Sequence, residues 1–236
     1  MSLVFRFPIF FMPKKYKEKA ALIKQKEYPL EEAVELLTQA STTKFDGTAE
    51  VHVRLNADPA QGDQQVRATV TLPHGTGKTL RIAVVVPEDR AKEMLEAGAV
   101  KAGEENLIKA IEKGELDFDV LVAVPSSMKS LGKVAKTLGQ KGLMPNPKAG
   151  TVTDNPVQAI KELQKGKIEF RNDKQAIIHS IFGKISFGKE KLTENLRVLL
   201  VAVKEARPAG IKGEYIKSIT ITPTMGPSIR VAQGGM

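Results

Sequence analysis

The chain has 236 residues, of which 42% are hydrophobic, enough for one large core or two modest ones. Lys and Arg number 36 against 27 Asp and Glu, and the formal charge of +9 favours phosphate-rich partners, nucleic acid first and an anionic membrane surface second. The absence of Cys excludes disulfides, thiolate metal sites and Cys nucleophiles, and it fits a reducing cytoplasm.

Other classes of site also lack the residues they need. His52, His74 and His179 are far apart and show no metal-ligand spacing, so we expect no metal site and no cofactor. The GxSxG, HExxH and GxGxxG motifs are absent, and we therefore predict no catalytic residues and no enzymatic activity. No apolar stretch reaches the roughly 18 residues that cross a bilayer, so no membrane partner is expected.

Residues 1–11 (MSLVFRFPIFF) form an apolar extension without a small-residue cleavage site. We interpret it as a start codon assigned too far upstream, with Met12 as the native start. A remnant of an organelle-targeting segment is the second interpretation. A third places the protein on a membrane surface through Phe5 to Phe11.

The first part of the chain predicts a helix and a pair of strands. The Lys-rich run at 14–26 is typical of a solvated helix or a flexible arm. Residues 29–40 carry apolar side chains at helical spacing. Segments 49–55 and 65–72 each alternate apolar and polar residues. The turn-rich NADPAQGDQ between them predicts a hairpin with one solvent-exposed face.

The middle of the chain changes pattern. LRIAVVV at 80–86 is a continuous apolar run, typical of a strand buried on both faces. Helices at 88–97, 104–113, 128–138 and after Asn155 and Pro156, with a strand at 120–124, predict a βαβ-type parallel sheet over residues 79–165.

After residue 166 the half-buried pattern returns. Strands are predicted at 167–171, 176–187, 216–222 and 228–231, with a long amphipathic helix between them that ends at Pro208. The simplest organisation is an α+β domain made from 12–78 and 166–236, with an inserted α/β domain at 79–165. Two adjacent hinge strands would join the two domains.

The segment HGTGKT at 74–79 looks like the end of a phosphate-binding loop. That motif needs Gly where this chain has Leu72, and it needs a helix afterwards, whereas a strand is predicted here. A basic nucleotide-binding protein that uses this degenerate loop is the alternative function, and it requires nucleotide binding that Lys78→Ala abolishes.

Five segments in order carry a resemblance to a known family: TKFDGTAEVHVRL from Thr43, LPHGTGK from Leu72, GLMPNPKAGTV from Gly142, IEFRNDK from Ile168 and TMGPSIRV from Thr224. From about residue 12 to 231 the chain resembles the L-one family of large-subunit ribosomal proteins, in its bacterial or organellar form.

The resemblance implies that the inserted domain is a Rossmann-like three-layer α/β domain. It also implies a structural constituent of the large ribosomal subunit that binds ribosomal RNA, forms the mobile stalk near the exit site and assists release of deacylated tRNA. Repression of translation through its own operon mRNA is implied as well. We expect a monomer when free, located in the cytoplasm on the ribosome rather than in an organelle.

The family's RNA surface, carried onto this sequence, lies outside the inserted domain. It comprises Lys44, Phe45, Thr48, Glu50, Asp173, Lys174, Ser218, Thr224, Met225 and Gly226. Hydroxyl groups suit 2′-hydroxyls, Lys suits phosphate, Met can pack on a ribose or base, and Gly permits close backbone approach.

Structural alternatives remain open at this stage. Residues 224–227 could be merely a turn between strands, and Phe45 could be ordinary core. The acidic Glu50 would have to accept from a 2′-hydroxyl or a base amine. Two departures from the family pattern stand out: Lys141 replaces the usual Arg before LMP, and the usual Gly near Ala176 is absent, which leaves the local turn uncertain.

Overall fold

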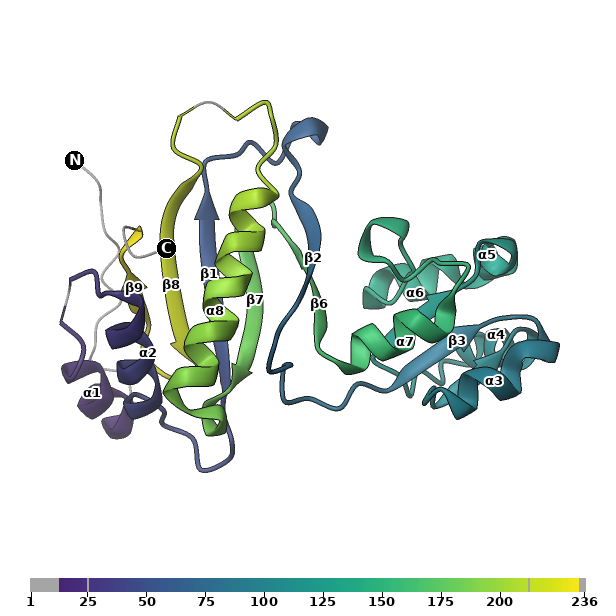
Figure 1. The fold of residues 1–236 in the computed structure, drawn as a ribbon, viewed down its shortest axis with the longest axis horizontal. Coiled ribbons are helices and arrows are strands. Elements are labelled where there is room, and N and C mark those ends of the chain that lie inside the picture. Colours follow the sequence, from purple (N-terminus) through teal and green to yellow (C-terminus); the bar gives the residue numbers. More distant parts are fainter. Residues whose placement is uncertain (1–12, 25, 212, 234–236) are drawn as a thin grey trace. The chain divides into compact units, whose positions relative to one another are not determined.

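The protein combines helices with strands, as predicted (Figure 1). The computed structural model describes residues 13–24, 26–211 and 213–233. Its contacts divide the chain into unit 1, with residues up to 66 and from 170 onward, and unit 2, with residues 67–169. The proposed extension at 1–11 and the alternative start at Met12 lie outside the described residues.

Unit 1 contains one four-stranded sheet and three α-helices within the described ranges. Its elements are α1 (Lys14–Ala21), α2 (Leu30–Gln39), β1 (Thr48–Leu55), β7 (Ile177–Lys184), α8 (Gly188–Glu205), β8 (Ile216–Pro223) and β9 (Ile229–Val231). The strands form an antiparallel sheet in the order β7-β1-β8-β9. Strand β1 from the first part of the chain therefore lies between two strands from the last part.

Helices α2 and α8 cover one face of this sheet and pack on each other, as Figure 1 shows. The predicted helix at 29–40 is confirmed, with Leu30, Ala33, Val34 and Leu37 buried and two Glu in its first turn. Strand β1 buries every second side chain, from Ala49 to Leu55. This alternation leaves the other face of the sheet to polar residues.

We call that second face the polar face. It is formed by Thr48, Glu50, His52 and Arg54 of β1, Ile177, His179, Ile181 and Lys184 of β7, Ser218, Thr220 and Thr222 of β8, and Arg230 of β9. All of these side chains are half-buried or exposed.

A β-bulge in β7 changes which of its residues reach the polar face. Gly183 is opposite Ala49 and Ile181 is opposite Glu50, so Phe182 is the extra residue. The carbonyl of Phe182 accepts a hydrogen bond of 2.8 Å from the side-chain amide of Asn195, which is fully buried in α8. Beyond the bulge the alternation is reversed, and Lys184 lies opposite Thr48 on the polar face.

The predicted hairpin between segments 49–55 and 65–72 is wrong. Strand β2 (Arg67–Thr71) pairs with β6 (Lys167–Arg171) in a separate two-stranded sheet, while β1 pairs with β7 and β8. The reason lies in the side chains: none of the five residues of β2 is buried, so it has no apolar face to place against α2 and α8. The pairing of β1 therefore follows the apolar face that each strand can bury and not the order of the strands in the sequence.

Unit 2 contains the predicted parallel sheet. Besides β2 and most of β6, its elements are β3 (Ile82–Val85), α3 (Ala91–Glu96), β4 (Lys101–Gly103), α4 (Glu105–Glu112), β5 (Val120–Ala123), α5 (Met128–Leu131), α6 (Ala135–Lys141) and α7 (Pro156–Gln164). The parallel strands have the order β4-β3-β5. Alternate residues of β3 belong to two separate apolar clusters, so helices cover both faces of this sheet.

Some predicted boundaries differ from the structure. The helix predicted at 128–138 is interrupted by a 3-10 turn (Gly132–Val134), and α8 ends at Glu205 rather than at Pro208. The short strand β4 was not predicted, because three residues give too little periodicity.

The bulge in β7 generates a prediction about stability. Asn195→Ala removes the donor to the Phe182 carbonyl and should lower the free energy of unfolding by about 1–3 kcal/mol, because a buried acceptor loses its partner. Urea unfolding measures this change. The control is Lys191→Ala, on the exposed side of α8, which should change stability by less than about 0.5 kcal/mol. Equal midpoints for both variants would contradict the role given to Asn195.

Candidate nucleic-acid interface

The ten residues predicted to bind RNA all lie in unit 1, around the polar face and its two ends. Six gather where β1 begins and β8 ends: Lys44, Phe45, Thr48, Thr224, Met225 and Gly226. Glu50 and Ser218 lie on the polar face itself, and Asp173 with Lys174 precedes β7 at its other end. Eight-residue strands separate the two ends by roughly 25 Å, so the residues form an extended surface.

The turn after β8 has an unusual backbone. The Gly226 amide donates to the Pro223 carbonyl at 2.8 Å, and Met225 has a φ of 58°. A Cβ at Gly226 would be 2.5 Å from the Pro223 Cγ and 3.1 Å from the Ala40 carbonyl oxygen. Gly226 is thus required by close packing inside the protein, in addition to any approach of RNA.

Thr224 fastens this turn to the start of β1. Its hydroxyl accepts from the Thr48 amide at 2.8 Å and donates to the Thr48 carbonyl at 3.1 Å. Its own amide donates to the same carbonyl at 3.0 Å. Because the hydroxyl hydrogen is used within the protein, Thr224 can offer RNA only an acceptor lone pair, and its main effect is to position the turn.

The turn and the neighbouring loop expose two large apolar side chains. Met225 is 76% exposed and Phe45 is 61% exposed. The Thr42 hydroxyl donates to the Met225 carbonyl at 3.2 Å, and the Thr43 hydroxyl donates to the Phe45 carbonyl at 3.0 Å. The alternative that Phe45 is ordinary core is therefore wrong, and both side chains are available for stacking or packing against a partner.

Sequence reasoning missed two residues at this end of the sheet. The Lys184 ammonium donates to the Thr48 hydroxyl at 3.0 Å, which places a cation beside the turn. The Asp46 carboxylate accepts from the amide and the hydroxyl of Ser186 and so fixes the loop that carries Phe45. The only sequence signal for Lys184 was the break in alternation at FGK, which marks the bulge.

At the other end, Asp173 organises the turn before β7. Its carboxylate accepts from the amides of Ile177 and Gln175, both at 2.8 Å, and these hydrogen bonds, that from Ile177 above all, lower the pKa of Asp173. Ala176 has a φ of 59° and is buried. The turn thus forms without the usual Gly, and it leaves Lys174 exposed.

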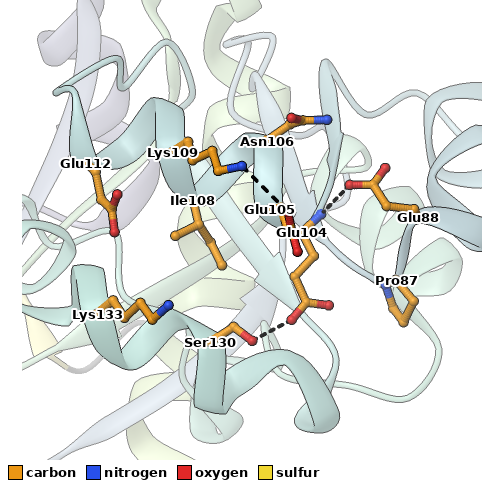
Figure 2. Close-up of a pocket in the computed structure, with 10 residues that line it drawn as sticks. All are labelled: Pro87, Glu88, Glu104, Glu105, Asn106, Ile108, Lys109, Glu112, Ser130 and Lys133. Atoms are coloured by element: carbon orange, nitrogen blue, oxygen red, sulfur yellow. Dashed lines mark hydrogen bonds and ion pairs between the residues drawn. The ribbon is translucent and has the colours of Figure 1, made fainter.

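Unit 2 contains a cleft of about 840 Å³ at the carboxyl ends of its parallel strands, shown in Figure 2. Four carboxylates line it, those of Glu88, Glu104, Glu105 and Glu112, together with Lys109 and Lys133. The Ser127 and Ser130 hydroxyls both donate to the Glu104 carboxylate. Because the lining carries more negative than positive charge, this cleft does not favour the phosphates of a nucleotide.

The degenerate phosphate loop at 74–79 does not have the structure of one. It leads into β3 rather than into a helix, and the Lys78 ammonium donates to the Asp119 carboxylate at 2.9 Å. Lys78 and Arg81 together hold the pKa of Asp119 well below its usual range. The cation that would contact phosphate is therefore already paired, which argues against the nucleotide-binding alternative.

The part of the chain that the structure describes contains no group of three His, Cys, Asp or Glu residues placed to hold a metal ion. It also contains no helix that combines the length and apolar character needed to cross a bilayer.

Comparison with known proteins gives a consistent result. A model of the ribosomal protein L1p/L10e family matches residues 37–227. Proteins described as large ribosomal subunit protein uL1 from two strains of Prochlorococcus marinus are 52% and 48% identical, covering 89% and 92% of this chain and 89% and 93% of their own. The protein of that description from a Synechococcus strain is 48% identical over 93% of this chain and 95% of its own. The chain belongs to the ribosomal protein L1p/L10e family, in its bacterial form.

Proposed function

We propose that the protein is a structural constituent of the large ribosomal subunit that binds ribosomal RNA through the polar face of unit 1 and its two ends. Membership of the L1p/L10e family supports the ribosomal assignment, and the protein is not an enzyme. In this proposal unit 1 is the RNA-binding domain, and the ten predicted residues from Lys44 to Gly226 contact the RNA.

The observation that carries the proposal is Met225. A non-Gly residue at positive φ costs folding free energy, and a large apolar side chain that stays exposed contributes none of the free energy that its burial would give. Met225 combines both features, at the same end of the sheet as the exposed Phe45. Strain of this kind, held by surrounding hydrogen bonds, is concentrated at functional sites.

The chemistry of the surface suits folded RNA. Proteins recognise such RNA by its shape, by 2′-hydroxyls and phosphates, and by stacking on exposed bases. The polar face supplies hydroxyl groups from β8, Lys44 and Lys174 supply exposed cations at its two ends, and Phe45 with Met225 supplies an apolar platform. The overall charge of +9 adds attraction that does not depend on sequence.

The finer roles extend this proposal. Bound to large-subunit RNA, the protein forms the mobile stalk near the exit site, and transient contact with deacylated tRNA assists its release. The same interface binds a look-alike structure in the protein's own operon mRNA and represses translation. Because one surface serves both RNAs, they compete for it. The protein acts in the cytoplasm on the ribosome and is a monomer when free.

RNA affinity measured across a salt series tests the proposal. We expect tight binding to the stalk-base region of large-subunit RNA that persists from about 50 to about 200 mM salt. Binding to a scrambled RNA of equal length should be lost over the same range. Filter binding measures both. Equal affinities that decline together would mean that only the positive charge acts, and the ribosomal RNA assignment would have to be withdrawn.

Met225→Gly separates the stability of the turn from its binding. Gly relieves a left-handed cost of roughly 1–2 kcal/mol at an entropic cost of roughly 0.5–1 kcal/mol, so stability should rise slightly. Affinity for the stalk-base RNA should fall about tenfold, or about 1.4 kcal/mol, because the apolar contact is lost. Urea unfolding and filter binding measure the two effects.

The matched control is Met225→Leu, which keeps an apolar side chain of similar volume and should retain most of the RNA affinity. Unchanged affinity in Met225→Gly would remove Met225 from the interface. A loss of both stability and affinity would show instead that the side chain supports the fold.

A further inference from the structure

Two histidines meet in the middle of the polar face. His52 of β1 and His179 of β7 are directly opposite in register, and their Nδ1 atoms are 2.8 Å apart. The centroids of the two rings are 5.0 Å apart, and the ring planes form an angle of 63°. At this distance one Nδ1 must donate a hydrogen and the other must accept it.

The turn before β7 determines which nitrogen donates. The His179 Nε2 lies 3.4 Å from the Asp173 carboxylate. Hydrogen bonds from backbone amides keep that carboxylate ionised by lowering the pKa of Asp173, so it acts only as an acceptor. His179 then carries its hydrogen on Nε2 and accepts on Nδ1, and His52 donates from its Nδ1. The Nε2 of His52 is left as the unprotonated nitrogen of the neutral pair.

One proton can join this pair without breaking it. Protonation of the His52 Nε2 leaves the bond between the rings intact, whereas a second proton would place two N–H groups face to face. In the free protein, burial and then the neighbouring His179 lower the pKa of His52, against an opposite effect of Glu50. These effects favour the neutral form of the His52 ring in the absence of RNA.

The groups around the pair carry both signs of charge. The charged neighbours are Glu50 and Arg54 on β1, Asp173 in the turn before β7, and Arg230 on β9, opposite Thr220. The other neighbours are uncharged: Ile177 and Ile181 on β7, and Ser218, Thr220 and Thr222 on β8. No excess of cations already occupies this part of the face. A phosphate placed here would therefore shift the balance toward a protonated imidazole.

The pair is also enclosed by residues proposed to bind RNA. Glu50 is the next residue of β1 on the same face, about 7 Å along the strand, and Ser218 is a diagonal neighbour of His52 on β8. Asp173 faces His179 directly. An RNA that contacts all three of these residues must pass over the two rings.

We propose that His52 and His179 are two further RNA-contacting residues, and that the pair takes up one proton when an RNA phosphate binds over it. The imidazolium formed at His52 donates its Nε2 hydrogen to a phosphate oxygen. The inference rests on the proposed function. It makes RNA affinity depend on pH, whereas the apolar contacts of Phe45 and Met225 are independent of pH.

Affinity for the stalk-base RNA measured from pH 8 to pH 6 at constant salt tests this inference. If RNA raises the pKa of His52 by about one unit, wild-type affinity should rise up to about tenfold as the pH falls. His52→Asn should remove most of this rise. The chain has three His and no Cys, so His74→Asn is the matched control, and it should keep the full pH dependence.

A second measurement needs no substitution. NMR titration of the His52 Cε1 proton, in the free protein and in the complex, should give a higher pKa for His52 in the complex. An unchanged pKa, a wild-type affinity independent of pH, or a pH dependence lost in His74→Asn would each overturn the inference. Specific binding at pH 8 would leave the proposed function standing in those cases, whereas a lack of specific binding at every pH would remove the proposed function itself.

Discussion

Unit 1 depends on the antiparallel pairing of β1 with β7 on one side and β8 on the other. The hydrogen bonds between Thr48 and Thr224 join residues 176 positions apart, and they belong to the same pairing. Neither end of the chain can bury its apolar face alone, because β1 supplies the centre of the sheet while α8 and its neighbouring strands supply the rest. Loop-closure entropy must be overcome before these contacts form, and the proposed RNA interface is complete only when both ends have joined.

Two local features convert this pairing into a shaped surface. The bulge at Phe182, with its carbonyl held by Asn195, turns Lys184 toward Thr48 instead of into the core. The hydrogen bonds between Thr224 and Thr48 fix the turn that exposes Met225. Each feature uses a buried or half-buried polar group to set the position of an exposed one. The exposed residues therefore depend on hydrogen bonds that a list of surface side chains would not include.

Periodicity in the sequence predicted most elements because it reports which face of an element is buried. The apolar spacing in α2 and the continuous run in β3 are direct examples. It could not predict the partners of β1, since alternation is the same whichever strand pairs with it. For the interface, family motifs supplied ten residues, but the proximity of Lys184 and of the two histidines follows from register and a bulge. The exposure of Phe45 likewise depends on a loop that Asp46 holds in place.

Among the described residues, Ala176 and Met225 are the two that adopt positive φ without being Gly, and they lie in the turns at opposite ends of the polar face. At Ala176 the cost has an internal explanation, because the methyl group is buried and two hydrogen bonds to Asp173 hold the turn. At Met225 the hydrogen bonds explain how the turn is held but not why a long apolar side chain is exposed there. The RNA contact that we propose for Met225 would supply that reason. Hydrogen bonds also hold the turns at both ends, and under the proposed function this would reduce the ordering cost that a flexible interface has to overcome.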